Sequence, residues 1–318
     1  MLARRSGSWV EPPASAVREV VARALAEDLG VFGDVTAALV PPDARVSAVL
    51  ASRAVGVLAG RSCAEEVFRA VDPETTLEWR AADGDRLEPG TVIARVEGRL
   101  ASVLTAERSA LNLMGHLSGV ATLTRRFVEA AGPTARIRDT RKTTPGLRAL
   151  EKAAVRAGGG VNHRASLSDG ILVKDNHLAG LSIAEAVATA HDRWPGVACQ
   201  VECDTLDQLK VALEAGADLV LLDNMEPDTV AAAVALVDHR IPVEVSGRVD
   251  LASVAAYAAA GADLISVGAL THSAPVLDIG LDLEPGSPRR PMPTEPGSPR
   301  RPMPTEPGSP RRPGQVGA

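Results

Sequence analysis

The chain has 318 residues, of which 45% are hydrophobic and 23% are charged, and its formal net charge is −6. This size and composition indicate a soluble globular protein with room for two domains. No uncharged apolar run of about 18 residues is present, so a membrane span is not expected. The N-terminal MLARRSGSWVEPP lacks an apolar stretch of signal-peptide length, and we expect a cytoplasmic protein.

The first third of the chain is predicted to combine helices with a hairpin-rich sheet. Apolar positions recur at helical spacing over residues 15–29, after a serine that can cap a helix. Short β-like runs separated by turns follow within residues 45–60, 76–81 and 91–98. Helical periodicity returns over residues 101–131. A non-enzymatic alternative takes residues 46–98 as a lipoyl-like carrier sheet, because residues 83–98 are similar to the hairpins of such modules. No lysine precedes Lys142, so nothing there can be lipoylated or biotinylated.

Beyond residue 133, strands and helices alternate, which is typical of a parallel α/β fold. Seven apolar segments are predicted strands: residues 135–139, 159–164, 170–175, 199–203, 219–223, 242–246 and 264–268. A complete barrel has eight strands, so a barrel made of these segments would be incomplete. An open doubly wound sheet would give similar local signals, but no G-x-G-x-x-G follows the first strand.

The C-terminal end differs from the rest in composition. From Glu284 the sequence EPGSPRRPMPT occurs twice and begins a third time, without apolar periodicity. We predict that residues 284–318 are a disordered tail. The tail carries a net +3 and the whole chain −6, so the preceding residues carry −9, which argues against a nucleic-acid partner. The three cysteines, Cys63, Cys199 and Cys203, show no metal-ligand pairing and are expected in the core.

Polar residues at the strand ends favour a barrel. Glu202, Asp223, Ser246 and Gly268 follow apolar strands at intervals of 21, 23 and 22 residues, about one βα unit each. We therefore expect them to meet at the C-terminal face, where barrel enzymes bind their substrates. Glu202 and Asp223 could hold a divalent ion or sugar hydroxyls, and their hard oxygen ligands favour Mg²⁺.

The last two strands are followed by small residues suited to phosphate. Barrels commonly bind phosphate after their final strands, and small side chains let backbone N–H groups approach its oxygens. The candidates are Ser246, Gly247, Val267, Gly268 and Ala269, with Arg248 as a charged contact.

A basic cluster is predicted opposite the two acids. Residues 139–177 contain three of the four lysines of the chain. Five basic side chains are expected at the mouth: Arg141, Lys142, His163, Arg164 and Lys174. Because so many cations repel one another, a polyanionic substrate is expected among them. Two alternatives are a surface ion-pair cluster around Asp139 and an aldolase-like Schiff base on Lys174. The third lysine, Lys152, lies in a helical stretch and is predicted at the surface or an interface.

The segments that carry these residues resemble those of a known family. The segment DTRKTTPGLRALEKAAVRAGGGVNHR, followed by LSDGILVKDNH, is similar to the signature region of the quinolinate phosphoribosyltransferases, also called carboxylating nicotinate-nucleotide diphosphorylases. The likeness continues through LTAERSALNLMGHLSG, VECD, LLDNM and GALTHSAPVLDIGLDL. The resemblance implies an N-terminal α/β sandwich domain over residues 1–130, an incomplete seven-stranded barrel over residues 131–270, and a C-terminal segment, residues 271–283, that packs back on the body.

The resemblance also implies roles for individual residues. Quinolinate would meet Arg141, His163 and Arg164, together with Arg108 from the second subunit of a homodimer. Lys142, in the same loop as Thr140, and Lys174 would lie between quinolinate and the pyrophosphate of phosphoribosyl pyrophosphate. Glu202 and Asp223 would hold the ribose hydroxyls and Mg²⁺. The 5′-phosphate would be bound by Ser246, Gly247 and Gly268, with His272 nearby.

The chain departs from the family pattern in the phosphate loop. Arg248 replaces a small residue, and Val245 replaces a common serine. The repeat tail also has no counterpart. The reaction implied is phosphoribosyl transfer to quinolinate with decarboxylation, which gives nicotinate mononucleotide, pyrophosphate and CO₂ in NAD biosynthesis without an organic cofactor.

Overall fold

The structure is a computed structural model that describes residues 11–284. The predicted tail beyond Glu284 lies outside the described residues. Glu284, predicted as the first residue of the tail, is instead bonded to the N-terminal part of the chain. Its N–H donates to Ser47 O (2.9 Å), and its carboxylate pairs with Arg95 (2.9 Å). Among the described helices, none is long and apolar enough to cross a membrane.

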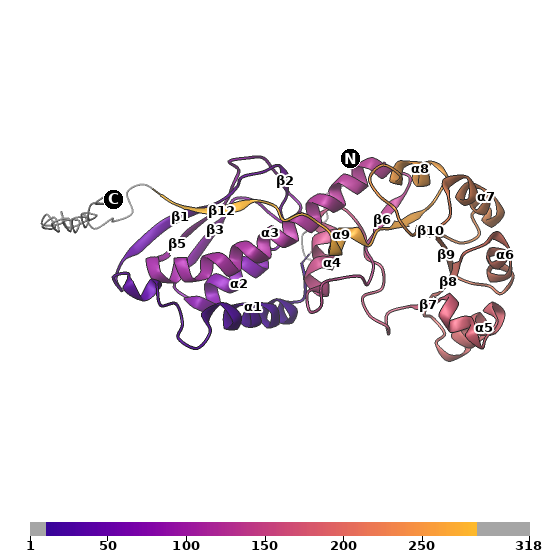
Figure 1. Cartoon of the computed structure of the whole chain (residues 1–318), viewed down its shortest axis with the longest axis horizontal. Helices are drawn as coiled ribbons and strands as arrows, with labels where there is room; N and C mark the ends of the chain where they lie inside the picture. The colour runs from indigo at the N-terminus through magenta and orange to yellow at the C-terminus, as the bar shows by residue number, and fades with distance from the viewer. Residues whose placement is uncertain (1–10, 285–318) are drawn as a thin grey trace, which may run out of the picture. The chain divides into compact units, whose positions relative to one another are not determined.

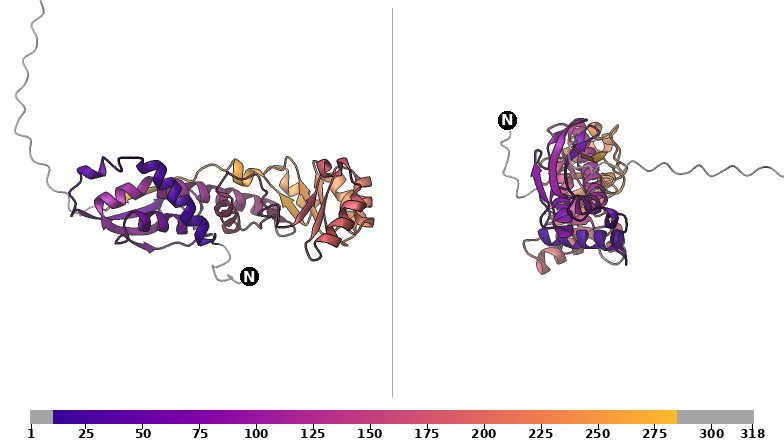
Figure 2. Two further views of the ribbon diagram at one scale, coloured as in Figure 1. Left: turned by 90° about the horizontal axis from the view of Figure 1, so that it is seen from below. Right: turned by 90° about the vertical axis from the view of Figure 1, so that its left-hand side faces the viewer.

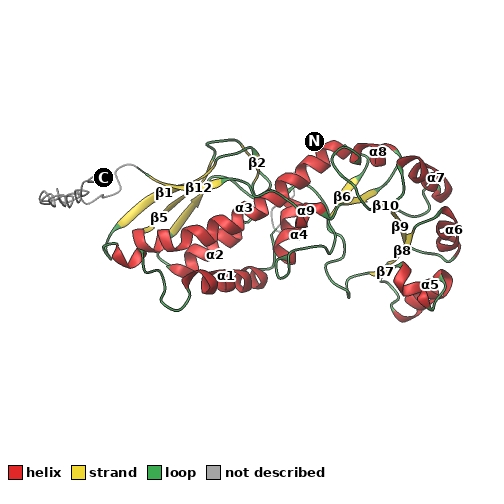
Figure 3. Cartoon of the chain, viewed as in Figure 1, coloured by secondary structure: helices red, strands yellow, loops and turns green. Residues whose placement is uncertain are grey.

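The N-terminal part is built around an antiparallel sheet (Figures 1 and 3). Its strand order is β12-β1-β5-β3, with β1 (Arg45–Ser52), β3 (Thr76–Trp79), β5 (Val92–Arg99) and β12 (Ile279–Leu283). A short ribbon pairs β2 (Gly56–Val57) with β4 (Arg86–Leu87). Along β1, the buried Val46, Ala48 and Leu50 alternate with less buried residues, so one face of the strand joins the core.

Three helices pack with this sheet. They are α1 (Ala14–Leu29), α2 (Arg61–Val71) and α3 (Leu100–Ala131), with a short turn of 3₁₀-helix at Ala37–Leu39. No helix is predicted where α2 lies. Its buried residues Cys63, Ala64, Val67 and Phe68 nevertheless follow helical spacing, and they fill the core beneath the sheet.

The long helix α3 connects the two parts of the chain. It contacts α2, β5 and β12 on one side, and α4, α8 and β6 of the second part on the other. The C-terminal segment returns across this helix at Gly119, where a Cβ atom would lie 2.0 Å from Pro275 O. Glycine is therefore required at this crossing, which lets residues 271–283 run back to the first sheet, where β12 pairs with β1.

The second part contains a six-stranded parallel sheet in the order β6-β11-β10-β9-β8-β7. Its strands are β6 (Arg136–Arg138), β7 (Ile171–Val173), β8 (Cys199–Cys203), β9 (Leu219–Asp223), β10 (Val243–Ser246) and β11 (Leu264–Ser266). The accompanying helices are α4 (Arg148–Ala157), α5 (Ile183–Arg193), α6 (Leu206–Glu214), α7 (Pro227–Val237), α8 (Val254–Ala259) and α9 (Ala269–His272), with a 3₁₀ turn at Asp175–Ala179. Helices α5 to α8 lie along the outside of the curved sheet (Figures 1 and 2).

The prediction of a strand over residues 159–164 is wrong in extent. In the part of the chain that the structure describes, this segment makes a single parallel bridge, between Val161 and Arg138. Backbone pairing with β6 stops after Val161, because the next N–H on that side, from His163, donates to the Asp139 side chain at Oδ1 (2.8 Å). Among the described residues, this segment does not pair with β7. The sheet therefore stays open between β6 and β7, and the barrel is incomplete.

Candidate functional site

Three polar side chains lie along one rim of the parallel sheet. Glu202, Asp223 and Ser246 stand at or next to the ends of β8, β9 and β10, and Ser246 is directly paired with Asp223 in the register. Because parallel strands end at the same edge, these groups share the mouth of the barrel. All three are partly exposed, so they can reach a bound molecule.

Lys174 follows β7 and extends the same rim. Its ammonium is in direct contact with the Glu202 carboxylate. His177 Nδ1 accepts the backbone N–H of Lys174 (3.0 Å), so His177 shapes the turn after β7. The neighbouring strands β7, β8 and β9 thus bring one cation, Lys174, and two anions, Glu202 and Asp223, to the same rim.

The loop after β10 is shaped by glycine. Gly247 has a φ of +93°, and a Cβ atom there would lie 2.4 Å from Asn224 Oδ1 and 2.7 Å from Asn224 N. Asn224 in turn donates to Asp223 Oδ2 (2.6 Å). Arg248, which follows, is exposed and also has a positive φ, of 50°, which is uncommon for a residue with a side chain.

The last strand brings a second small-residue loop to the mouth. A Cβ atom at Gly268 would meet His272 Nε2 and Lys142 Cδ, each at 3.2 Å. Thr271 Oγ1 donates to Lys142 O (2.8 Å), which ties this loop to the loop after β6. Ala269, beside Gly268, begins α9 and is partly buried. Val267 N–H donates to Arg138 O (2.9 Å), so this amide is used within the sheet and does not face a phosphate.

The loop after β6 carries Thr140, Arg141 and Lys142. Thr140 Oγ1 accepts the N–H of Lys142 (3.0 Å) and so holds the turn. Arg141 Nε is buried and has no hydrogen-bond partner among the described residues. A buried donor normally has a partner, so this guanidinium is suited to an acceptor from a bound molecule.

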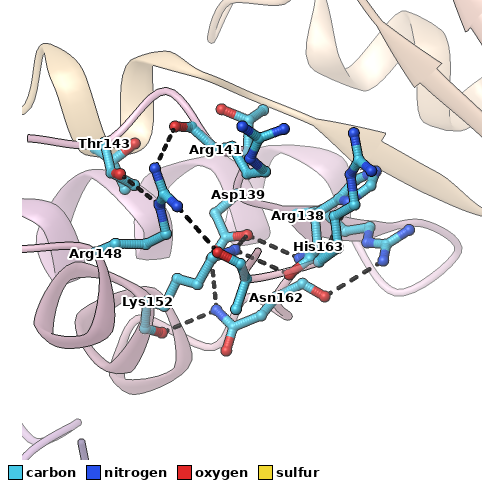
Figure 4. Close-up of polar contacts among 12 residues, drawn as sticks. Arg138, Asp139, Arg141, Thr143, Arg148, Lys152, Asn162 and His163 are labelled. Atoms are coloured by element: carbon cyan, nitrogen blue, oxygen red, sulfur yellow. Dashed lines mark hydrogen bonds and ion pairs between the residues drawn. The ribbon is translucent and has the colours of Figure 1, made fainter. Parts of the chain in front are cut away.

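Lys152 and Asp139 form a buried pair beneath these loops (Figure 4). Lys152, predicted at the surface, has a side chain only 4% exposed, and its Nζ lies 2.5 Å from Asp139 Oδ1. Burial raises the pKa of Asp139 and lowers the pKa of Lys152, while the attraction between the two opposes both shifts. The prediction that Lys152 lies at the surface or an interface is therefore wrong, because α4 turns this side chain into the interior of the chain.

His163 is held as a neutral ring. Its Nδ1 accepts Arg164 N–H (2.7 Å), which leaves the proton on Nε2, 3.6 Å from Glu244 Oε1. Burial, helped by nearby cations and opposed by Glu244, lowers the pKa of His163 to about 4. The contact with Glu244 is therefore not a salt bridge at neutral pH. Burial and the charge of Arg141 also lower the pKa of Arg164, so the two arginines are close enough to repel.

A buried acid inside the barrel was not predicted. Glu244, in the middle of β10, is fully buried and accepts from Arg138 (2.6 Å), Gln200 (2.8 Å) and Ser266. A lone glutamate between two valines in a buried strand is a usable signal, since buried charges need partners. This network forms the floor below His163.

Arg108 lies apart from the mouth. It is an exposed residue of α3 and lines a cavity of about 490 Å³ with residues of the same helix and of the returning C-terminal segment: Leu111, Asn112, Val276, Leu277, Asp278 and Ile279. No barrel-strand residue borders this cavity. The other predicted basic residues are carried by the loops and strand ends of the barrel.

Comparison with known proteins agrees with this architecture. Sequence models of the N-terminal and C-terminal domains of quinolinate phosphoribosyl transferase match residues 34–118 and 120–282. The chain is 46% identical over 278 residues to the carboxylating nicotinate-nucleotide pyrophosphorylase of Mycobacterium leprae, covering 84% of this chain and 97% of that one. It is 43% identical to a probable enzyme of the same name from Bacillus subtilis, covering 81% and 90%.

Solved structures give the same result. The nicotinate-nucleotide pyrophosphorylase of Francisella tularensis superimposes with a TM-score of 0.83 at 36% identity, over 88% of this chain and all of that one. NadC from Streptococcus pyogenes has a TM-score of 0.82 at 38% identity, over 86% and 99%. Fold and matches together define a two-domain enzyme with an α/β barrel. The chain belongs to the quinolinate phosphoribosyltransferase family.

Proposed function

We propose that this chain transfers the phosphoribosyl group of phosphoribosyl pyrophosphate to quinolinate and releases pyrophosphate and CO₂, which yields nicotinate mononucleotide for NAD biosynthesis. The observation that carries the proposal is one barrel mouth with cationic loops on one side and strand-end acids with a glycine-shaped loop on the other. This division of charge suits a dianionic acid beside a phosphorylated sugar.

The cationic side would bind quinolinate. Arg141 and Arg164 are close enough to repel each other, and a ligand with two carboxylates would relieve that repulsion. The neutral ring of His163 would line this side without adding a charge, because its Nε2–H faces Glu244. These groups would hold the ring nitrogen in line with the ribose C1.

The opposite side would bind the sugar phosphate. Glu202 and Asp223 would face the ribose hydroxyls, while Ser246, Gly247, Gly268 and Ala269 would surround the 5′-phosphate, with Arg248 and His272 at its border. Gly268 supports this arrangement because it lies against both Lys142 and His272. Lys142 and Lys174 would then lie near the pyrophosphate, between the two substrates.

Mg²⁺ fits the acids of this rim. It is usually bound through one or two carboxylates and substrate phosphates, not by a cage of protein ligands. The described residues hold no cluster of three or more such ligands, but Glu202 and Asp223 provide the two carboxylates. When bound, the ion would neutralise charge that develops on the departing pyrophosphate.

The protein's own residues can support both bond changes. As the ring nitrogen forms its bond to C1, the bond from C1 to pyrophosphate breaks, and Lys142 and Lys174 would stabilise the leaving group. The alkylated ring then carries a positive charge, which can accept the electron pair left when the 2-carboxylate departs as CO₂. A proton finally replaces the carboxylate. No step needs an oxidant or an organic cofactor.

The alternative of a Schiff-base aldolase is less well supported. Lys174 is in an ion pair with Glu202, whereas a lysine that attacks a carbonyl must be neutral. The aldolase reading also leaves Arg141, Arg164 and the glycine-shaped loop without a role.

We further propose that the enzyme is a cytoplasmic homodimer in which Arg108 completes the partner's site. Arg108 is exposed and away from the mouth of its own chain. Nearby, Thr105 of the same helix binds Asp34 (2.8 Å), in a loop whose Val31 and Phe32 are 94% and 90% exposed. Large apolar side chains so exposed are typical of a surface covered by a partner.

The proposed reaction is tested by incubating purified protein with quinolinate, phosphoribosyl pyrophosphate and Mg²⁺. We expect equal amounts of nicotinate mononucleotide and CO₂, and loss of product when the metal is chelated and not replaced. Borohydride treatment with a carbonyl substrate should not trap Lys174; covalent trapping there would favour the aldolase.

A further inference from the structure

The residues proposed to bind quinolinate stand on two stretches that the sheet barely joins. The Arg141 loop (residues 139–144) follows β6, and the His163 segment (residues 161–165) precedes β7. Among the described residues, the backbone connection between them is the single bridge at Arg138 and Val161 and its flanking hydrogen bonds. The spacing between Arg141 and Arg164 must therefore be fixed by other contacts.

Lys152 provides one such contact from α4. Its Nζ donates to Asp139 Oδ1 (2.5 Å) at the start of the Arg141 loop, and to His163 O (2.9 Å) in the His163 segment. Asp139 completes the connection by accepting His163 N–H (2.8 Å) and Asn162 Nδ2 (2.5 Å). One buried ion pair thus holds both stretches.

Arg148 provides a second contact, four residues earlier on the same helix. Its Nε donates to Thr143 Oγ1 (3.0 Å), and its two terminal nitrogens donate to Ala165 O (3.1 Å) and Arg141 O (3.5 Å). Residues four apart lie on one helix face, so α4 presents both cations to the two stretches. Figure 4 shows Arg148 reaching Thr143 and the neighbourhood of Arg141.

The charge of both side chains is used within the protein. The ammonium of Lys152 is paired with Asp139, and the guanidinium of Arg148 is occupied by a hydroxyl and two carbonyl oxygens. Neither is required as a direct ligand of the acid. What they do provide is geometry, since each joins the two stretches that carry Arg141 and Arg164.

We propose that Lys152 and Arg148 are positioning residues, which set the spacing of Arg141 and Arg164 and so select an aromatic acid with two adjacent carboxylates. The proposal rests on the proposed function, because it assumes that these arginines bind quinolinate. A displacement of about 1 Å at a positioned group can cost up to about 100-fold in rate, so the effect on quinolinate should be large although neither residue touches it.

Two variants test this role without leaving a buried charge unpaired. Arg148→Met removes a cation whose acceptors are neutral. The double variant Asp139→Asn/Lys152→Met removes both members of the buried pair. Its amide oxygen can still accept His163 N–H, whereas its NH2 group replaces the oxygen that accepts Asn162 Nδ2. Lys152→Met alone would leave Asp139 unpaired and destabilise the fold. We expect each variant to raise the KM for quinolinate by roughly tenfold or more. The KM for phosphoribosyl pyrophosphate should rise by a clearly smaller factor, because most of its proposed contacts lie outside the two stretches.

The control is Leu50→Ala, which destabilises the antiparallel sheet by opening a cavity and should leave the quinolinate KM unchanged below its unfolding temperature. The proposal is overturned if the folded variants keep the wild-type quinolinate KM, or if the KM for quinolinate and the KM for phosphoribosyl pyrophosphate rise by the same factor. If the double variant does not fold, Arg148→Met alone decides between these outcomes. Failure of the proposed function is separate: in that case the wild-type protein itself makes no nicotinate mononucleotide.

Discussion

The His163 ring is neutral because of the surroundings of its two nitrogens. Nδ1 accepts a backbone N–H, and Nε2 faces a network in which Glu244 is already bonded to Arg138, Gln200 and Ser266. A proton added to this ring would have to be held near several cations in a buried site. The low pKa of about 4 reflects that burial.

This pKa predicts how stability depends on pH. Because the pKa of His163 is lower in the folded chain than its ordinary value of 6.5, the unfolded chain takes up a proton between pH 6.5 and 4 that the folded chain does not. Stability should therefore fall as the pH decreases through this window, by up to about 3 kcal/mol at its lower end. Above pH 6.5 the contribution is constant.

The measurement is denaturant unfolding of the wild type and of His163→Gln at several pH values. We expect the difference between their free energies of unfolding to shrink as the pH falls from 6.5 to 4. A difference that stays constant over this range would contradict the neutral assignment.

At the residue scale, the side chains at the barrel mouth could be predicted from the sequence better than the buried side chains that support the mouth. Glu202, Asp223 and Ser246 could be found because strand ends of a barrel meet at one face. Lys152 could not, because helical periodicity does not say which face of α4 is covered by the Arg141 loop. Glu244 was missed for a related reason: its partners Arg138, Gln200 and Ser266 lie on three other strands.

At the element scale, the loop after β10 joins two strand ends. Gly247 passes so close to Asn224 that a methyl group would displace it, and Asn224 is bonded to Asp223. Gly247→Ala should therefore raise the KM for phosphoribosyl pyrophosphate as well as lower stability by about 1–3 kcal/mol.

Gly90→Ala is the matched control. Gly90 has a similar φ of +86°, but nothing lies within 4 Å of its Cβ position. Both variants should lose stability through backbone strain, and only Gly247→Ala should change the KM, as determined by steady-state kinetics. An equal KM in the two variants would show that the close approach to Asn224 does not affect the site.

Two elements differ from the sequence prediction: the strand expected at residues 159–164 and the helix α2. The segment at residues 159–164 has a single large apolar side chain, Val161, and its ladder ends after one bridge because Asp139 accepts His163 N–H. Helix α2 was overlooked between two β-like runs, although Cys63, Val67 and Phe68 follow helical spacing. Long-range contacts decide the first case, whereas the signal for the second was local.

At the scale of the whole molecule, the proposed homodimer would bring the exposed Arg108 of α3 to the barrel mouth of the partner chain. If Arg108 enters the partner's site, Arg108→Ala and Lys174→Ala should each be inactive alone. Mixed dimers of the two variants contain one site with both residues intact, so mixing should restore up to about half of the activity per mixed dimer.

The experiment mixes the purified variants and follows activity while subunit exchange is monitored by mass. Recovery that parallels exchange is expected. If exchange is complete and activity does not return, Arg108 and Lys174 do not act in a site shared between subunits.

The central claim is that the cationic loops fit two carboxylates, and one comparison tests it most directly. Nicotinate lacks the carboxylate next to the ring nitrogen, so one cation of the pair Arg141 and Arg164 would stay unpaired, at a cost of about 2–5 kcal/mol. We predict that kcat/KM for quinolinate exceeds that for nicotinate by at least roughly 30-fold, and that Arg141→Ala and Arg164→Ala narrow the difference. Equal use of the two acids by the wild-type protein would contradict the account.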